Sequence, residues 1–327
     1  MDGELSNGLP RLTTSGNQIV RAGGRAAVLL RGVNRSGLEH SEPDEQGFLS
    51  AAGISRSEIQ TIVNEWGSNI IRLPLNQDWV LRGRGRWPAD AYRSALDQVI
   101  GWASRFGAYT LLDLQWLDAD CTYGGERNFV APLPNPQSVE LWRLLAARYR
   151  GEPAVLYDIF SEPHDRLPDD PCPFNRADGA PCPPELFRVT MAEWKPWAYK
   201  LVTTIREVNP DSLVFVSGTN WGYDLRGMPL DAQNLVYSTH VYPAKGGDWP
   251  AAFGRLAATA PVFAAEWGGD EADLKWGRKL LKYFDRLQIG WTAWSWHDAP
   301  FIVRRYTPTP FGTLVRARLL RESERTR

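Results

Sequence analysis

The sequence predicts a single (β/α)8 barrel, the TIM-barrel form of the α/β class, with a short β-hairpin ahead of its first strand. Three observations lead to this fold class. Short apolar runs rich in β-branched residues occur eight times, amphipathic segments with helical period separate most of them, and 327 residues suit one such barrel. Continuously apolar strands that alternate with helices are typical of a parallel sheet covered by helices.

The expected strands cover residues 27–33, 69–73, 109–114, 155–160, 213–216, 235–239, 261–265 and 291–295. Helical period appears in residues 55–66, 89–105, 138–149, 194–208, 271–287 and 311–321. The segment after the fifth strand is weaker, and the one after the sixth, residues 249–256, is short. An open doubly wound sheet would usually carry a glycine-rich phosphate turn after its first strand, and the turn Val33-Asn-Arg-Ser-Gly-Leu38 is not one.

The hairpin is expected between Leu12 and Val28, with turns at Ser15-Gly16 and Gly23-Gly24. We expect it to cap the N-terminal end of the barrel. No linker, repeat or shift in composition marks a second domain. The chain is therefore predicted to be one catalytic barrel over residues 1–327, with residues 1–26 as the cap.

Charge and hydropathy exclude several classes of protein. The formal net charge is −1, which argues against a nucleic acid or an anionic membrane as partner. No apolar run approaches the ~18 residues of a membrane span. The N-terminus lacks a signal peptide's basic and apolar regions, so we expect either a cytoplasmic protein or a secreted one whose signal is absent from this sequence. We expect a monomer.

Cysteine and histidine spacings predict no metal and no cofactor, because neither C-x-x-C nor a zinc-type histidine pair occurs. Cys121 stands alone. Cys172 and Cys182 close a short proline-flanked loop, where a disulfide and two free thiols are both compatible with the sequence.

Two glutamates carry the strongest chemical signal. The active sites of (β/α)8 barrels lie at the C-terminal ends of the strands. The fourth expected strand leads to Glu162 and the seventh to Glu266, each a costly place for a charge that has no task. Two carboxylates facing each other across a barrel mouth are the minimal machinery of glycoside hydrolysis. Fifteen tryptophans fit a ligand with flat faces, such as a sugar.

A series of motifs in the same order resembles glycoside hydrolase family 5, the cellulase family A group, over about residues 30–300. The motifs are Arg31-Gly-Val-Asn34, Ile71-Arg72-Leu-Pro, Glu162-Pro163, Ser238-Thr-His240-Val-Tyr242, Glu266 and Trp294-Ser-Trp. The resemblance implies that Arg72, His240, Tyr242 and Trp294 join the two glutamates as functional residues.

Chemistry assigns a role to each of these residues. Glu266 is expected to be the ionised nucleophile, with Arg72 and Tyr242 supplying a cation and a hydrogen-bond donor. Glu162 is expected to be the general acid and base, with a raised pKa. His240 can bond Glu162 or a sugar hydroxyl.

Further residues that follow the strands are expected to bind the sugar. Trp294 is expected to floor the subsite of the reacting sugar, although Trp291 and Trp296 flank it. The other candidates for substrate binding are Asn34, Trp116, Trp221 and Trp267, and Trp79 is a further possible platform.

Two positions depart from the family pattern. Ser161 stands where the family usually has asparagine before the acid/base, and Gln115 stands where it usually has histidine after the third strand. We expect Ser161 to support catalysis less well than asparagine, by losing a bond to the sugar 2-hydroxyl or bridging it through water, and Gln115 to bind substrate.

The sequence thus predicts a retaining glycoside hydrolase, an endoglucanase-like enzyme that cleaves β-1,4-glucan by double displacement. A β-mannanase or an exo-acting β-glucosidase on short oligosaccharides is the alternative within this class. Outside it, Ser161 and Gln115 leave open a sugar-binding barrel of low activity. A metal-dependent hydrolase is disfavoured by four histidines without an H-x-H pair.

Overall fold

The protein is described here from a computed structural model. It describes residues 8–123, 126–127, 130–166, 187–271 and 273–323. Cys172 and Cys182 lie outside the described residues, so both states of this pair stay open.

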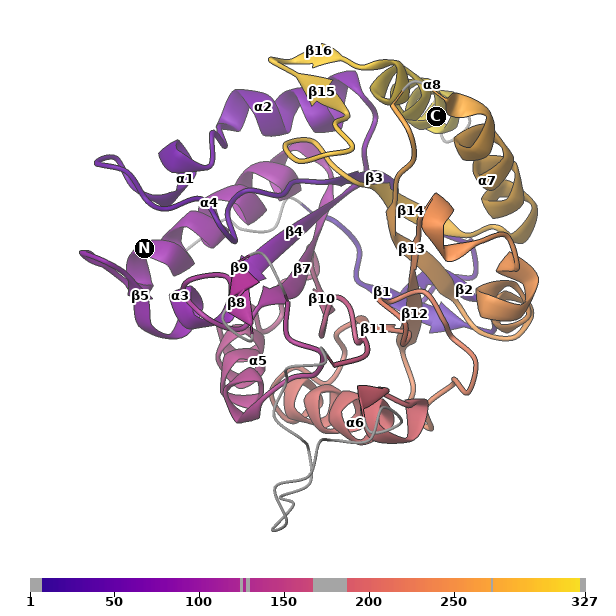
Figure 1. The fold of residues 1–327 in the computed structure, drawn as a ribbon, viewed down its shortest axis with the longest axis horizontal. Helices are drawn as coiled ribbons and strands as arrows, with labels where there is room; N and C mark the ends of the chain where they lie inside the picture. Colours follow the sequence, from indigo (N-terminus) through magenta and orange to yellow (C-terminus); the bar gives the residue numbers. More distant parts are fainter. Residues whose placement is uncertain (1–7, 124–125, 128–129, 167–186, 272, 324–327) are drawn as a thin grey trace.

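Eight parallel strands close into a barrel, which confirms the predicted fold class (Figure 1). In chain order they are β3 (Arg31–Asn34), β4 (Ile70–Asn76), β7 (Tyr109–Trp116), β10 (Val155–Asp158), β11 (Val214–Ser217), β12 (Leu235–Val241), β13 (Val262–Trp267) and β14 (Gly290–Ala293). Each pairs with its neighbours in the sequence, and β14 pairs with β3 to close the ring.

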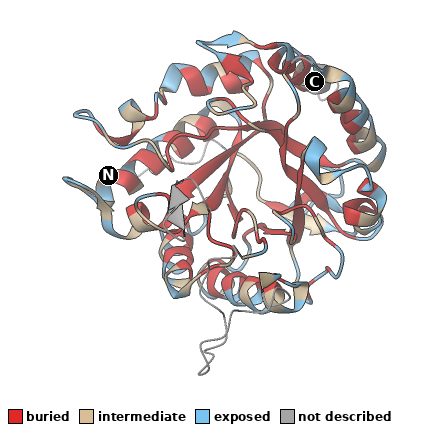
Figure 2. Ribbon diagram, viewed as in Figure 1, coloured by how far each residue is buried: buried red, intermediate tan, exposed pale blue. Residues whose placement is uncertain are grey.

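Helices surround the barrel, and Figure 2 shows the strands buried while the outer helix faces are exposed. They are α2 (Arg56–Gln60), which runs into a π-helical turn at Thr61–Glu65, α4 (Ala89–Phe106), α5 (Pro136–Arg148), α6 (Met191–Val208), α7 (Leu274–Leu287) and α8 (Pro310–Ser323). Between β11 and β12, all of which is described, there is no helix. After β12 come only short turns, at Pro243–Lys245, Pro250–Gly254 and Leu256–Ala258. Both weak helical signals in the sequence therefore mark real gaps in the helical layer.

Smaller elements lie in the loops. Two short helices, α1 (Phe48–Ala51) and α3 (Gln77–Arg82), follow the first two strands. Three two-stranded hairpins are formed by β5 (Gly83–Arg84) with β6 (Trp87–Pro88), β8 (Thr122–Tyr123) with β9 (Glu126–Arg127), and β15 (Val303–Arg304) with β16 (Thr307–Pro308). Within the described residues, no helix is long and apolar enough to cross a bilayer.

The N-terminal hairpin, β1 (Leu12–Ser15) with β2 (Gln18–Arg21), packs on the N-terminal end of the barrel as expected. Leu12 and Ile19 join one apolar cluster with Leu30 and Tyr109 of the barrel. The first barrel strand starts later than predicted, at residue 31, because Ala27 and the residue after it pair with the hairpin instead.

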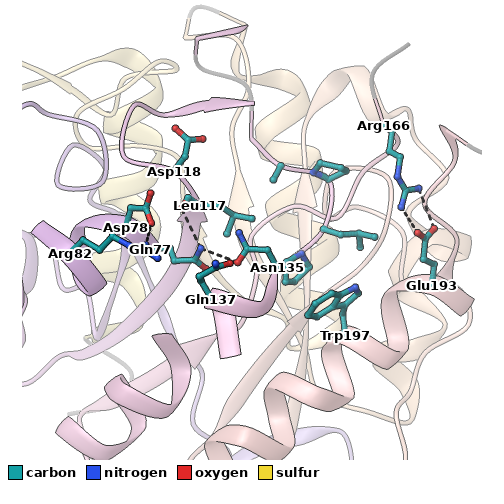
Figure 3. A pocket seen from close by; sticks show the side chains of 14 residues that line it. Gln77, Asp78, Arg82, Leu117, Asp118, Asn135, Gln137, Arg166, Glu193 and Trp197 are labelled. Atoms are coloured by element: carbon teal, nitrogen blue, oxygen red, sulfur yellow. Dashed lines mark hydrogen bonds and ion pairs between the residues drawn. The ribbon is translucent and has the colours of Figure 1, made fainter. Parts of the chain in front are cut away.

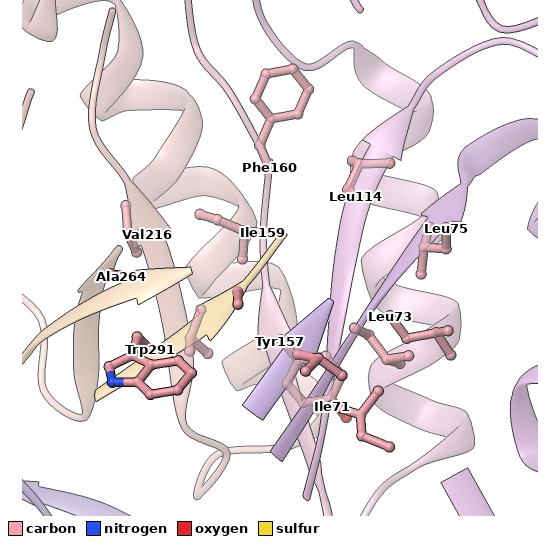
Figure 4. Close-up of a cluster of buried hydrophobic side chains, with 14 of the residues drawn as sticks. Ile71, Leu73, Leu75, Leu114, Tyr157, Ile159, Phe160, Val216, Ala264 and Trp291 are labelled. Atoms are coloured by element: carbon pink, nitrogen blue, oxygen red, sulfur yellow. The ribbon is translucent and has the colours of Figure 1, made fainter. Parts of the chain in front are cut away.

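Alternation along each strand separates an inner from an outer face. On β4, Ile71 and Leu73 point toward the helices and join the large outer core that Figure 4 shows. Ile70 points into the barrel and joins the inner apolar cluster. Arg72, two residues further along the same inner face, begins a polar layer above that cluster.

Candidate active site

The side chains of this polar layer come from strands on opposite sides of the barrel. Glu162 lies in the loop after β10, and Glu266 is the penultimate residue of β13. The β12–β13 pairing shifts register, with Ser238 opposite Phe263 but His240 opposite Glu266. An extra residue of this kind is a β-bulge, which re-aims side chains. It turns Glu266 into the barrel, next to His240.

Glu266 has a cation and a donor on its two oxygens. Nη1 of Arg72 donates to Oε1 at 2.9 Å, and the Tyr242 hydroxyl donates to Oε2 at 2.7 Å. Burial and the neighbouring Glu266 raise the pKa of Tyr242 well above its usual value, so this hydroxyl keeps its proton. Both contacts stabilise an ionised carboxylate.

Arg72 is fully buried and bonds to four further residues. Its Nε donates to Asp158 at 3.0 Å, Nη1 to Asn34 at 2.9 Å and Nη2 to Ser161 at 3.0 Å. Asp113 lies 2.9 Å from Nη2 as an ion pair. Burial by itself would lower the pKa of Arg72, but the surrounding carboxylates raise it above its usual value.

One guanidinium therefore faces three buried carboxylates. Burial raises the pKa of Asp158 to about 6, despite the opposing effect of Arg72. It raises the pKa of Asp113 well above its usual range. Neither residue was identified from the sequence. The available signal was a lone aspartate inside an apolar strand, at Leu112-Asp113-Leu114 and at Tyr157-Asp158.

Glu162 has different neighbours from Glu266. Burial raises its pKa to about 7, while the charges of Lys245 and Arg72 act to lower it. One oxygen lies 2.9 Å from Nδ1 of His240. Burial lowers the pKa of His240 to about 3, so the ring is neutral near pH 7 and can bond a protonated Glu162.

The two carboxyl groups are close together. An oxygen of Glu162, an oxygen of Glu266 and a ring nitrogen of His240 all lie within 4.8 Å of one another. A separation of about 5–5.5 Å is typical of retaining glycosidases, whereas inverting ones leave roughly 6.5–9.5 Å for a water. The same three atoms could in principle hold a cation, but Arg72 and Tyr242 already bond the oxygens of Glu266.

A second group of potential metal ligands lies after β3 and β14. His40 Nε2 is 3.1 Å from Asp298 and 3.6 Å from Glu39. Burial lowers the pKa of His40, but its bond to Asp298 and the charge of Glu39 outweigh this and bring it to about 9. The three side chains thus form an ion-pair group by themselves.

Ser161 lies between Arg72 and Gln115. Its hydroxyl accepts from Arg72 and donates to Gln115 Oε1 at 2.9 Å, and the residue is 2% exposed. Both of these partners lie within the protein. The expectation that serine loses the bond to the sugar 2-hydroxyl, or bridges it through water, stays a prediction. Gln115 is partly exposed, unlike Ser161.

Two expected substrate-binding residues are corrected. Asn34 is completely buried, and its side chain bonds Arg72 and the carbonyl groups of Ala265 and Thr292. It therefore positions Arg72 and does not reach a sugar. Trp267 is also fully buried and packs edge-on against Trp291 and Phe311. Alternation after the bulge turns it outward into the helical layer.

The remaining tryptophans divide between core and site. Trp79, Trp291 and Trp296 are 0–3% exposed and belong to the core. Trp294 is the partly exposed member of its group, and its Nε1 donates to Ala299 at 3.2 Å. Trp116 is 8% exposed and contacts the partly exposed Trp221. Trp294 and Trp221 are thus the accessible candidates for a sugar platform.

A separate hollow of about 630 Å³ lies between α3, α5 and α6 (Figure 3). Arg166 pairs with Glu193 in it, and Gln77 donates to Asn135 at 3.1 Å. Its lining contains neither glutamate of the site and no predicted site residue. Several of its polar side chains pair with one another, as Arg82 does with Asp78 and Arg166 with Glu193. We therefore assign no catalytic role to this hollow.

Comparison with known proteins gives one family. The family model "Cellulase (glycosyl hydrolase family 5)" matches residues 31–300. Endoglucanase MaCel5A of Microbulbifer is 24% identical over 306 residues, which cover 88% of this chain and 51% of that protein. An endoglucanase of Paenibacillus polymyxa is 25% identical over 86% of this chain and 78% of that one. The chain spans about half the length of the first curated relatives it matches.

Solved structures show the same fold. β-Glucanase SdGluc5_26A of Saccharophagus degradans superposes with a TM-score of 0.73 and 22% identity, covering 99% of this chain and 98% of that one. The catalytic domain of Thermobifida fusca endoglucanase Cel5A, in complex with cellotetraose, superposes with a TM-score of 0.70 and 20% identity, covering 97% of this chain and 100% of that one.

Proposed function

The chain belongs to glycosyl hydrolase family 5, and from that premise we propose that it hydrolyses β-1,4-linked glucan with retention of anomeric configuration. Glu266 is the nucleophile and Glu162 the general acid and base. The observation that carries the proposal is the pair of glutamates within 4.8 Å in opposite environments. One is held by a cation and a hydroxyl donor, and the other has a pKa raised to about 7.

In the first step, Glu266 Oε attacks the anomeric carbon while Glu162 gives its proton to the leaving oxygen. A glycosyl ester forms on Glu266, the glycosidic bond breaks, and the leaving sugar departs with a free hydroxyl. Arg72 and Tyr242 bond the two oxygens of the nucleophile and hold it oriented until attack. Neutral His240 holds the Glu162 carboxyl at 2.9 Å.

In the second step, Glu162 is ionised because it has given up its proton. It accepts a proton from water, which attacks the same anomeric carbon and releases Glu266. Two inversions restore the original configuration. The partly exposed amide of Gln115, oriented by Ser161, is the side chain next to the acid/base that can bond the reacting sugar, and Trp294 provides a floor.

The relatives support glucan as the substrate, since those named above are endoglucanases and a β-glucanase, and one neighbour is a complex with cellotetraose. A screen over cello-, manno- and xylo-oligosaccharides and aryl β-glycosides tests this. We expect the highest kcat/KM on cello-oligosaccharides, with the β-anomer as first product in ¹H NMR. An α-anomer as first product, or hydrolysis of none of the cello substrates, overturns the proposal.

The pH profile gives a second test. Glu162 must be protonated to act as an acid, and its pKa is about 7, so kcat/KM falls as pH rises through about 7. The Glu162→Gln variant loses this limb. An unchanged rate and an unchanged limb in Glu162→Gln would remove Glu162 from the mechanism.

A further inference from the structure

The loop after β11 contains a left-handed turn directly beside the acid/base. Asn220, Trp221 and Gly222 have φ angles of 56°, 59° and 70°, a conformation that a residue as bulky as tryptophan rarely adopts. The turn is bonded on both sides: Trp221 N–H donates to the Pro163 carbonyl at 3.0 Å, and His240 N–H donates to Gly222 at 3.2 Å. It therefore joins the Glu162 loop to β12.

Gly222 explains how closely this turn approaches the site. A Cβ atom at this position would lie 2.8 Å from Cγ of the His240 ring. Only glycine allows both the left-handed conformation and this approach. Any side chain at this position would therefore clash with the His240 ring.

The indole of Trp221 already has two neighbours. The His164 ring stacks on it with centroids 3.7 Å apart and planes 12° apart. The ammonium group of Lys245 lies over the ring, 5.8 Å from its centroid. His164 therefore closes one face of the indole to a sugar, and the Lys245 ammonium lies near the same ring. This differs from the simple sugar platform that the sequence suggested.

Lys245 is fixed by the same turn. Its Nζ donates to the Asn220 carbonyl at 3.0 Å and to Asn220 Oδ1 at 3.3 Å. An ammonium group has three N–H donors, so among the described residues these two bonds leave one donor for a ligand. The side chain is partly exposed, which lets a ligand reach it.

Lys245 acts on the acid/base. Its charge lowers the pKa of Glu162. Burial lowers the pKa of Lys245 itself, against the opposing effect of the Glu162 carboxylate. Other charged or titratable groups among the described residues around Glu162 are Arg72 from β4, His240 from β12, Tyr242 after β12, Glu266 from β13, and His164, whose ring nitrogen lies 2.7 Å from the Glu162 carbonyl. Glu162 protonates the leaving oxygen in the proposed mechanism, and the turn that holds Lys245 is bonded to Pro163, the residue after Glu162. We therefore expect Lys245 to lie on the side of the leaving sugar.

We propose that Lys245, held by Asn220 above Trp221, binds a hydroxyl group of the leaving-group sugar and makes the enzyme selective for sugar over aryl leaving groups. This inference rests on the proposed function and names the part of the substrate that this side of the site recognises. The sugar is held through its hydroxyl groups by the ammonium, rather than by stacking flat on Trp221. The same charge favours ionisation of Glu162, which the second step requires.

The test compares Lys245→Met with wild type on cellotetraose and on 4-nitrophenyl β-cellobioside. Methionine keeps much of the stem and removes the charge. We expect kcat/KM on cellotetraose to fall roughly tenfold, through a higher KM, as for loss of a hydrogen bond from a charged group. On the aryl substrate KM stays unchanged. On both, the basic limb moves to higher pH, because removing a cation raises the pKa of Glu162.

Two further variants separate this role from a structural one. Lys245→Arg restores the cation and should recover most of the cellotetraose KM. Lys200→Met is the control. It removes a lysine on α6 whose Nζ lies 5.3 Å from the ring centroid of Trp197, and it should change neither the cellotetraose KM nor the basic limb of the pH profile. An equal loss on both substrates, or an unchanged cellotetraose KM and pH limb in Lys245→Met, overturns the inference while the proposed function stands. A wild-type chain that hydrolyses neither cello substrate overturns both.

Discussion

The interior of the barrel has two layers built by the same strands, one apolar and one charged. On β7, Leu111 faces inward in the lower layer and Asp113 in the upper one; on β10 the corresponding pair is Leu156 and Asp158. Two residues along a strand is roughly 7 Å. The charged layer therefore rests directly on an apolar floor, and this proximity desolvates it.

The difference shows how one alternation pattern serves two purposes. The apolar residues of the lower layer fill volume and stabilise the fold by burial. Because the interior is close-packed, even a small loss of side-chain volume there lowers stability. The upper layer has fewer cations than carboxylates, and burial shifts the pKa values of Asp113 and Asp158 upward. Arg72 is shared among Asp113, Asp158 and Glu266, and of these three carboxylates Glu266 also accepts from the Tyr242 hydroxyl. Stability and reactivity should therefore separate by layer.

The largest expected effect belongs to Glu266→Gln in the upper layer. Removing a nucleophile should lower kcat by about 10⁴-fold or more. The melting temperature should stay unchanged or rise, because one buried carboxylate fewer competes for Arg72. Steady-state kinetics and calorimetry of the same preparation check both. A variant that keeps a tenth of the wild-type kcat would remove the nucleophile from this layer.

Arg72→Met should lower both the stability and the activity of the protein. It leaves Asp113, Asp158 and Glu266 buried without their cation, which costs about 3–5 kcal/mol of unfolding free energy. Urea unfolding measures this cost. Arg82→Met serves as the control, since its ion pair with Asp78 is solvent-exposed and should cost at most about 1 kcal/mol. Equal costs for the two variants would argue that Arg72 is not the centre of the upper layer.

Leu111→Ala should damage stability alone. A large-to-small change in a buried floor position costs about 2–5 kcal/mol. At a temperature where the variant is fully folded, kcat should remain within a factor of about two of wild type, because the layer makes no contact with reacting groups. A kcat that falls together with stability would show that the two layers are mechanically coupled.

The smallest effect concerns Ser161 and Gln115, which bond each other in the upper layer. Ser161→Asn alone should leave kcat unchanged or lower it, since the larger side chain displaces Gln115. Adding Gln115→His, the usual family residue, should recover activity, with a coupling energy of about 0.5–3 kcal/mol in a double-mutant cycle. Additive effects would mean that the two positions act independently.

Much of the fold could be predicted because strands that are buried on both faces need continuous apolar runs, which are visible in the sequence. Each expected strand overlaps an observed one. The positions of Glu162 and Glu266 were predictable for the same reason, since each follows an apolar run and lies at the C-terminal end of the barrel strands. Their catalytic roles stay a proposal.

Other features depend on contacts that one segment does not encode. The bulge in β13 arises from its register with β12, so the outward position of Trp267 was not predictable from simple proximity to Glu266. Asp113 and Asp158 are explained only by Arg72, which is distant in sequence. Asn34 was assigned to substrate, but its three buried partners lie on β4, β13 and β14.

Trapping of the glycosyl intermediate tests the central claim that the two glutamates divide their tasks by environment. The enzyme is incubated with an activated 2-deoxy-2-fluoro β-cellobioside, digested, and its labelled peptide sequenced by mass spectrometry. The label should lie on Glu266, whose two oxygens are bonded by Arg72 and Tyr242. A label on Glu162, or a time-dependent inactivation that leaves Glu266 unmodified, would contradict this assignment.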